Sequence, residues 1–199
     1  MVVKILIMGD SWAADWSSKH SEYPGWLNIL ASSHDVTNIA QAGVSQYSIC
    51  KQMYDIHVTD YDKIIISITS PYRVYTPIHP VHHTDQLHGS ADLIYTDIEH
   101  HSKYEQYNPR LASAKDYFEH HFDITQAEFT HHLYVDWCLN RLDCDNTVVT
   151  SNIEHNSEYV GAHTYCDGFG IWNTYPGRIN HLSAEGNEVF AGNMQTLLK

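Results

Sequence analysis

The sequence predicts an α/β fold built on a doubly wound parallel sheet. Short runs that are almost entirely apolar and rich in β-branched residues, at 2–8 and 63–69, alternate with stretches of helical spacing. Such runs are typical of strands buried on both faces of a parallel sheet. Strands that alternate with helices indicate crossover connections between parallel neighbours. The 199 residues suffice for one domain with a sizeable core.

Composition indicates a globular protein and argues against two classes of partner. Hydrophobic residues make up 43% of the chain, and its net charge is −13 at pH 7 with histidine neutral. Nucleic acid and anionic membranes are recognised by clustered Lys and Arg, so neither is expected as a partner. We find neither a signal peptide nor a transmembrane stretch and expect a cytoplasmic protein. The four cysteines form no Cys-x-x-Cys pair and are expected to be reduced thiols.

The first strand is expected at 2–8, inside the sheet, and it ends in Gly9-Asp10-Ser11. Glycine permits a tight turn with unusual dihedral angles. Ser11 would then lie just past the carboxyl end of the strand, where open α/β sheets place their ligands. A rigidly held, accessible hydroxyl in this position is a candidate nucleophile. The alternative is that Asp10 or Ser11 only caps a helix.

The second strand is expected at 35–40, after a short helix that begins near Trp26. A turn of small residues around Gly43 follows, and glycine lets the main chain approach a ligand closely. Ser45 or Gln46 then begins a helix. The third strand, at 63–69, ends in Thr69 and Ser70, whose hydroxyls can each donate a hydrogen bond.

Residues 71–124 are expected to be an irregular insertion rich in tyrosine and histidine, because prolines at 71, 77, 80 and 109 interrupt any long helix. Irregular segments of this length are usually functional. The insertion leaves the sheet beside the expected site, so it is a candidate pocket wall. Trp12, Tyr72 and Arg73 are expected to line the substrate pocket. The aromatic residues suit a sugar or another flat ligand, or pack on their own domain.

The last third of the chain completes the alternation. A helix is expected over 125–142, capped by Thr125 or Asp123. Its predicted buried side carries Phe129, Leu133, Trp137 and Leu142. A strand follows at 146–151, and any fifth strand between 152 and 177 would be short. Ser183 is a good N-cap for a final amphipathic helix, and His181 lies just ahead of it.

These features, in this order, resemble the sequence blocks of the SGNH/GDSL hydrolases. The resemblance is carried by Gly9-Asp10-Ser11, the Gly43 turn, the strand end at Thr69-Ser70, and His181 before the final helix. It implies a three-layer α/β/α domain over 1–199, with a flavodoxin-like parallel sheet in the order 2-1-3-4-5. It also implies Ser11 as nucleophile, His181 as general base, and the N–H groups of Ser11 and Gly43 as oxyanion donors, with no cofactor.

Two positions depart from the pattern of this family. Its third block carries an asparagine, where this chain has Ser70 with Thr69 beside it, so a hydroxyl is the candidate third donor to the oxyanion. Its last block carries an aspartate three residues before the histidine, where this chain has Arg178. Arginine cannot accept the imidazole N–H. Asn180, Asp167 or a backbone carbonyl is then left to orient His181, or the site works as a Ser–His dyad.

Three functions follow, in descending order. The first is a serine esterase that cleaves a carboxylic ester, one form of which is an acetyl group on a carbohydrate. The second is an inactive SGNH-like module that binds a carbohydrate or a protein. The third is a nucleotide or flavin binder, ranked last because the first turn has one glycine where phosphate loops have several. Among the 16 histidines, a metal cluster is conceivable at four positions, but surface histidine is favoured and no metal is expected: His79, His82, His83 and His88.

Overall fold

A five-stranded parallel sheet forms the centre of the structure, a computed structural model that describes residues 2–16, 23–54, 56–82, 87–104, 108–177 and 181–199. The spatial order is β2-β1-β3-β4-β5, and every neighbouring pair is parallel. This confirms the predicted three-layer fold and its strand order, with the first strand inside the sheet. The strands are β1 (Lys4–Met8), β2 (Asp35–Asn38), β3 (Lys63–Ser67), β4 (Thr147–Ser151) and β5 (Thr164–Asp167).

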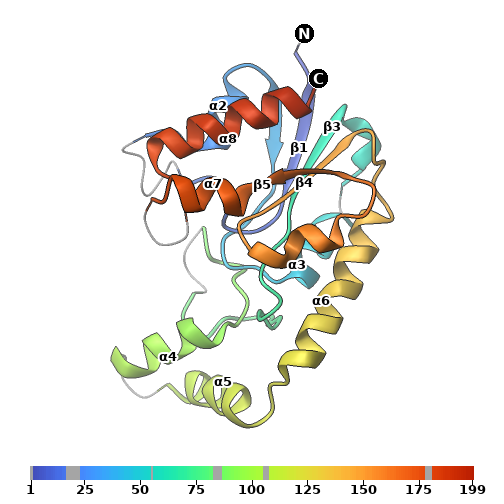
Figure 1. Ribbon diagram of the computed structural model, residues 1–199. Coiled ribbons are helices and arrows are strands. Elements are labelled where there is room, and N and C mark those ends of the chain that lie inside the picture. Colours follow the sequence, from blue (N-terminus) through green and yellow to red (C-terminus); the bar gives the residue numbers. More distant parts are fainter. Residues whose placement is uncertain (1, 17–22, 55, 83–86, 105–107, 178–180) are drawn as a thin grey trace.

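Alternate side chains of β1 pack on opposite faces of the sheet. Ile5 and Ile7 face the layer of α2 (Trp26–Ala31) and α8 (Ala184–Leu197), with α7 (Gly168–Thr174) beside it. Leu6 and Met8 face the layer of α3 (Gln46–Gln52) and α6 (Ile124–Leu139). This alternation is the ordinary consequence of the two-residue period of a strand, and it buries β1 on both sides (Figure 1).

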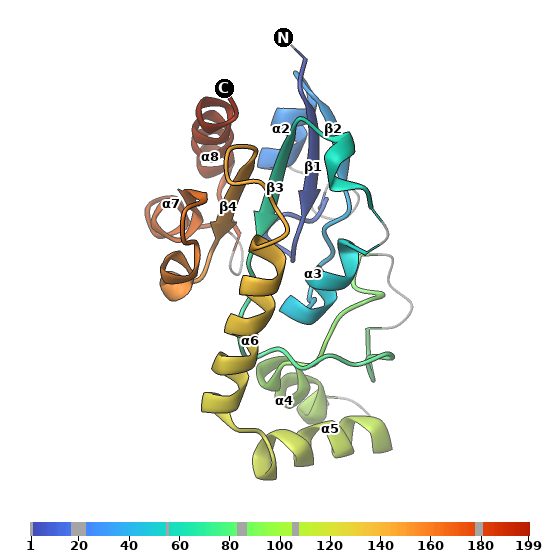
Figure 2. The ribbon, with the colours of Figure 1, turned by 90° about the vertical axis from the view of Figure 1, so that its right-hand side faces the viewer.

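Residues 71–122, called the insertion below, leave the sheet after β3 and contain two helices where the sequence predicted irregular structure. These are α4 (Tyr95–Tyr104) and α5 (Pro109–His120), which lie beyond the carboxyl ends of the strands (Figures 1 and 2). Pro109 occupies the first turn of α5, where its missing N–H costs nothing. The Asn108 side chain caps that helix by accepting from the N–H groups of Arg110 and Leu111. This proline therefore starts a helix instead of interrupting one.

The insertion has a small hydrophobic core of its own. It consists of Ile98 from α4 with Leu111, Ala114 and Phe118 from α5. These residues form a cluster distinct from the two clusters that cover the faces of the sheet. The insertion is therefore stabilised largely by contacts within itself.

The helix α6 carries the chain back from the insertion to the sheet. Asp123 caps it by accepting from the Gln126 N–H at 2.7 Å, as one of the two predicted caps. The predicted buried side was wrong, because Phe129 and Leu133 are 64% and 50% exposed. Apolar residues occur on several sides of this helix, so their spacing did not define a single face. Packing against α3 selects another side, on which Val135, Cys138 and Leu139 are buried.

Two thiols meet where α3 packs on α6. The Cys50 and Cys138 sulfurs are 3.0 Å apart and buried, and all four cysteines are free thiols. Among the described helices, none combines the length and apolar content needed to cross a membrane.

Candidate active site

The turn after β1 is held in place through Gly9. The Gln52 side chain, from the end of α3, accepts from the Gly9 N–H at 2.9 Å and donates to the Gly9 carbonyl at 3.1 Å. Gly9 has φ +142°, and a Cβ placed on it would lie 2.6 Å from the Cβ of Ser67. Only glycine fits this conformation and this close approach of β1 to β3. The backbone that presents Ser11 is therefore fixed from two sides.

Asp10 is buried beneath the same turn and has a structural role. Its carboxylate accepts from the Ser67 hydroxyl at 2.9 Å and from the Trp12 N–H at 3.2 Å. Burial raises the pKa of Asp10, and the Ser67 hydrogen bond and the Arg73 charge offset part of that increase. Asp10 therefore shapes the Ser11 turn from inside the protein.

A cavity of about 520 Å³ lies at the carboxyl end of the sheet. Ser11 after β1, Gly43 after β2 and His181 before α8 line it together with Trp16 and Arg73. The sequence analysis did not identify Trp16, and no periodicity marks it. The insertion supplies the remaining wall, with His82, His88, Ala91, Asp92, Ile94, Thr96, Asp97 and His100.

Two backbone N–H groups at this cavity are available as donors. Within the described residues, the N–H groups of Ser11 and Gly43 make no hydrogen bond. Gly43 has φ +80°, and a Cβ on it would lie 2.9 Å from the Cβ of Ala91. Its carbonyl accepts from the Asp92 N–H and from Arg73 Nη1, each at 2.9 Å. The Gly43 turn is thus fixed through its carbonyl, while its N–H stays unused.

Trp16 packs beside both Ser11 and His181. Its indole N–H donates to the Ser11 carbonyl at 2.8 Å, and its ring centroid is 4.7 Å from that of His181. The Ser11 hydroxyl makes no hydrogen bond to the described residues. Catalytic hydrogen bonds are often long without substrate and shorten when it binds. The structure therefore brings Ser11 and His181 to one cavity without joining them by a hydrogen bond.

Neither predicted hydroxyl donor reaches this cavity. Thr69 is fully buried and hydrogen-bonds to the Asp10 carboxylate. Ser70 Oγ accepts from the Tyr72 N–H at 3.3 Å and lines a second cavity. The first strand end and the third strand end are adjacent, as predicted, but the side chains after β3 turn elsewhere.

Of the three residues predicted to line the pocket, Arg73 alone lies at the Ser11 cavity. Trp12 is 3% exposed and packs edge-to-face on Phe190, with ring centroids 5.5 Å apart, so it is a core residue. Tyr72 is exposed, and its hydroxyl donates to Glu128 at 2.9 Å. The apolar character of Trp12 was compatible with pocket or core, and its packing under α8 decides for the core.

The candidate partners of His181 are placed as follows. The Asp167 carboxylate caps α7 by accepting from the Gly170 N–H at 2.9 Å, and it does not line the cavity. Asn180 and Arg178 lie outside the described residues. The His181 carbonyl accepts from the Gly177 N–H at 2.7 Å, which fixes the backbone ahead of α8.

A second cavity of about 490 Å³ lies between α3, α6 and the insertion. Four tyrosines line it, together with Gln46, Ser70 and other polar residues. Arg73 lines this cavity as well as the first, so its side chain lies between them. The tyrosines are Tyr47, Tyr75, Tyr117 and Tyr134.

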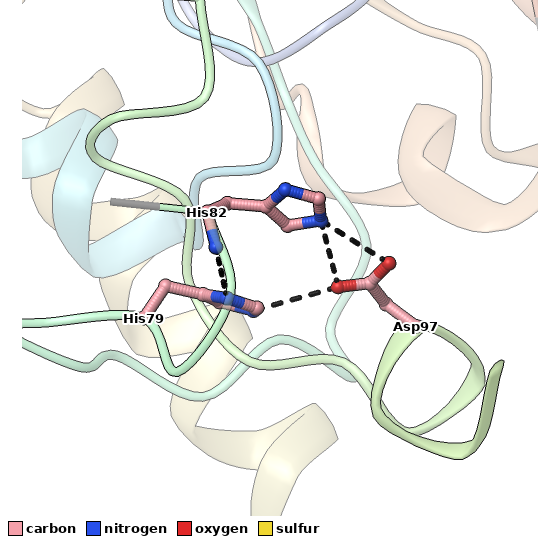
Figure 3. Close-up of side chains that lie close together, drawn as sticks. All are labelled: His79, His82 and Asp97. Atoms are coloured by element: carbon pink, nitrogen blue, oxygen red, sulfur yellow. Dashed lines mark hydrogen bonds and ion pairs between the residues drawn. The ribbon is translucent and has the colours of Figure 1, made fainter. Parts of the chain in front are cut away.

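A histidine cluster surrounds Asp97 in the insertion wall. The Asp97 carboxylate lies 3.5 Å from His79 Nε2, 3.2 Å from His82 Nε2 and 3.4 Å from His101 Nε2. Figure 3 shows the His79 and His82 rings turned toward it. Imidazole and carboxylate are ordinary metal ligands, and the donor atoms of His79, His82 and Asp97 all lie within 4.8 Å of one another.

The hydrogen bonds of His79 argue against a metal at this cluster. Its Nδ1 accepts from the N–H groups of Val81 and His82, at 3.1 and 3.0 Å. The proton of the neutral ring is therefore on Nε2, which faces Asp97, and a protonated nitrogen cannot bind a metal. Burial and the charge of His82 lower the pKa of His79 to about 4, so the ring is neutral at pH 7. The cluster is better described as imidazoles gathered around one carboxylate.

The remaining members of the predicted metal cluster lie apart from this carboxylate. His88 packs between His82 and Trp16, with ring centroids 5.3 and 5.6 Å away. His83 lies outside the described residues.

Comparison with known proteins gives no family assignment. No family model matches the sequence, and no curated protein matches it. Among solved structures, a salicylyl-acyltransferase, SsfX3, from a tetracycline biosynthetic pathway is similar over the whole chain, at 12% identity and a TM-score of 0.39. The chain spans 55% of the length of that protein. A phospholipase A1 from Streptomyces albidoflavus NA297 is similar over the whole chain and 98% of its own length, at 11% identity and a TM-score of 0.43. Similarities of this size carry no argument about activity, so function must be argued from the residues of this chain.

Proposed function

We propose that this protein is a serine esterase of the SGNH/GDSL type, which hydrolyses a carboxylic ester in the cavity at the carboxyl end of the sheet. One observation carries the proposal: Ser11, Gly43 and His181, from three distant parts of the sequence, line the same cavity. The unused N–H groups of Ser11 and Gly43 add the donors that such a reaction needs.

The reaction would run in two halves. Ser11 Oγ attacks the ester carbonyl carbon while His181 takes the hydroxyl proton. The carbonyl oxygen becomes negative and accepts hydrogen bonds from the backbone N–H groups of Ser11 and Gly43. The intermediate collapses to an acyl-enzyme, and His181 returns the proton to the departing alcohol. Water, deprotonated by His181, then releases the carboxylic acid and restores Ser11.

The narrower form of the proposal is that the substrate carries a small acyl group, such as acetyl, on a carbohydrate. The insertion wall presents imidazole, hydroxyl and carboxylate groups from His82, Thr96 and Asp97. Such groups are suited to hydrogen-bond the hydroxyls of a sugar. The net charge of −13 supports a small-molecule substrate over nucleic acid or an anionic membrane.

A second candidate function is an inactive module that binds a carbohydrate or a protein. Its support is the second cavity, whose tyrosines offer aromatic surface with polar groups around it. The placement of Asp167 as the cap of α7 adds to this, because a carboxylate from that residue does not face His181.

Labelling with a fluorophosphonate probe, together with hydrolysis of short-chain p-nitrophenyl esters, tests the proposal. We expect the wild-type protein to be labelled at Ser11 and to hydrolyse the esters. Ser11→Ala and His181→Ala should each lower kcat by several orders of magnitude. Ser70→Ala and His120→Ala are the matched controls, and both should keep wild-type activity.

Two results would reject the esterase. Labelling and hydrolysis that survive in Ser11→Ala would assign the activity to another residue. A wild-type protein that is neither labelled nor active on a broad ester panel, but binds an oligosaccharide or a protein, would establish the binding module.

A further inference from the structure

We propose that Arg73 is a catalytic residue and supplies the third oxyanion donor. The inference rests on the proposed esterase function and deepens it. Thr69 and Ser70, the hydroxyls expected to fill this role, are directed to Asp10 and to the second cavity. Arg73 lines the Ser11 cavity itself, three residues beyond Ser70.

The guanidinium group lies beside both turns that carry the other proposed donors. Arg73 Nη1 donates to the Gly43 carbonyl at 2.9 Å and lies 3.9 Å from the position of a Cβ on Gly43. The Arg73 charge also acts on Asp10, the residue immediately before Ser11. An oxygen bound between the N–H groups of Ser11 and Gly43 would therefore lie close to this cation.

Most of the hydrogen-bonding capacity of Arg73 is unused. A guanidinium group has five N–H donors in a rigid planar arrangement. Among the described residues, its single hydrogen bond is the one from Nη1 to the Gly43 carbonyl, and its Nε is buried without an acceptor. Buried donors without acceptors are costly and uncommon in native proteins. An acceptor that arrives only during the reaction accounts for donors kept unused.

The surrounding charges favour an oxyanion over a permanently anionic substrate. Arg73 interacts electrostatically with three carboxylates, those of Asp10, Asp92 and Asp97. These charges already balance the cation, so a substrate carboxylate or phosphate would gain little net attraction. They do not use the remaining N–H groups, which stay directed donors for charge that develops in the transition state.

Kinetics of Arg73→Met and Arg73→Lys on p-nitrophenyl acetate, a neutral ester, test the proposal. Loss of one oxyanion donor costs about 10²–10³ in kcat in other enzymes. We expect a loss of that size in Arg73→Met with KM changed less than about threefold, because the interaction forms mainly in the transition state. Arg73→Lys retains a cation with fewer directed donors, and its kcat should be intermediate. The Asp92 N–H still holds the Gly43 carbonyl in both variants, which favours retention of that turn.

Two further measurements separate a catalytic from a merely structural role. A short alkyl boronic acid, which forms a tetrahedral adduct with an active serine, should bind Arg73→Met more weakly by the factor lost in kcat/KM. Millimolar guanidinium ion should restore part of the activity of Arg73→Ala and leave Ser11→Ala inactive. The rescue works on folded protein and covers the case in which Arg73→Met is too unstable to assay.

The proposal is overturned if Arg73→Met keeps the wild-type kcat, or if only its KM rises. It is also overturned if a folded Arg73→Ala shows no guanidinium rescue. These failures leave the esterase function intact, because wild-type protein would still react through Ser11. A wild-type protein that neither reacts with the fluorophosphonate nor hydrolyses esters overturns both proposals together.

Discussion

Gly9 is the residue on which the geometry of the Ser11 turn depends most directly. Its φ of +142° is strained for any L side chain, and a Cβ there would lie 2.6 Å from Ser67 Cβ and 2.8 Å from the Ser67 carbonyl oxygen. Both neighbours belong to the adjacent strand, so the contact can be relieved only by separating β1 from β3. A single methyl group would therefore disturb the centre of the sheet.

Gly9→Ala should lower the free energy of unfolding by about 2–5 kcal/mol, the combined effect of backbone strain and overpacking. Urea denaturation measures the loss. Gly161→Ala is a matched control, because Gly161 has φ +59° with nothing within 4 Å of an added Cβ, and it should cost only about 1–3 kcal/mol. Gly192→Ala, on the open face of α8, should be neutral or stabilising by up to about 1 kcal/mol. Equal losses at Gly9 and Gly161 would show that contact with Ser67 is unimportant.

At the residue scale, the sequence predicted positions better than it predicted side-chain directions. Ser11 and Gly43 follow strands and His181 precedes a helix, so topology alone brings them to one edge of the sheet. The directions of Ser70 and Trp12 depend on packing that no local pattern encodes. Arg73 was placed at the pocket, but its contact with Gly43 joins residues far apart in the sequence.

The helix α4 is joined to the preceding turn of the insertion through Asp97 and His79. The His79 side chain is 1% exposed and neutral, with a pKa lowered by burial to about 4. Burial alone would raise the pKa of Asp97, but the His82 hydrogen bond and the nearby histidines hold it below its usual value. Acid must therefore charge a buried imidazole and neutralise a stabilised carboxylate.

The free energy of unfolding should consequently fall as the pH drops from about 6.5 to 4. In this window the unfolded chain binds a proton at His79 and the folded chain does not, so the unfolded state gains. Stability from this source is complete above pH 6.5, and its loss toward pH 4 is up to about 3 kcal/mol. Urea unfolding at pH 7 and pH 4.5 measures the difference.

His79→Asn is the informative variant, because Oδ1 of asparagine can accept from the N–H groups of Val81 and His82 but does not titrate. The variant should lose less stability than the wild type between pH 7 and pH 4.5. The exposed His120, changed to Asn as a control, should leave the pH dependence as it is. An unaltered pH dependence in His79→Asn would assign the acid sensitivity to other groups.

At the element scale, the sequence predicted the helices and strands of the sheet layers and missed those of the insertion. Proline was taken as an interruption, whereas Asn108 ahead of Pro109 makes it a helix start. The buried side of α6 could not be derived because its partner helix, α3, is remote in the sequence. Local signals define where an element lies, and tertiary packing defines which of its sides is buried.

For the whole molecule, the main division is between the sheet with its two helical layers and the insertion. The faces of the sheet carry two large hydrophobic clusters, and the insertion has four buried apolar residues at its centre. Less buried apolar surface gives less resistance to local unfolding. The insertion should therefore open at a lower free energy than the sheet.

Native-state hydrogen exchange tests this expectation. Amides of α4 and α5 should exchange through openings of lower free energy than those of β1 and β3, and with a smaller dependence on denaturant. Amides in the half of α6 around Val135 and Cys138 should behave like the sheet, against which they are buried. Exchange of all these elements at a single free energy would mean that the insertion and the sheet unfold as one unit.

The division of the cavity wall between these two parts has a consequence for how such a protein can change. Ser11, Gly43 and His181 lie on turns fixed by the sheet and its helices, where substitutions disturb the main core. His82, Thr96 and His100 belong to the insertion, whose small core is its own. Mutations can therefore accumulate on the recognition side at little cost to the scaffold, so selection can alter what enters the cavity while the reacting groups keep their inherited positions.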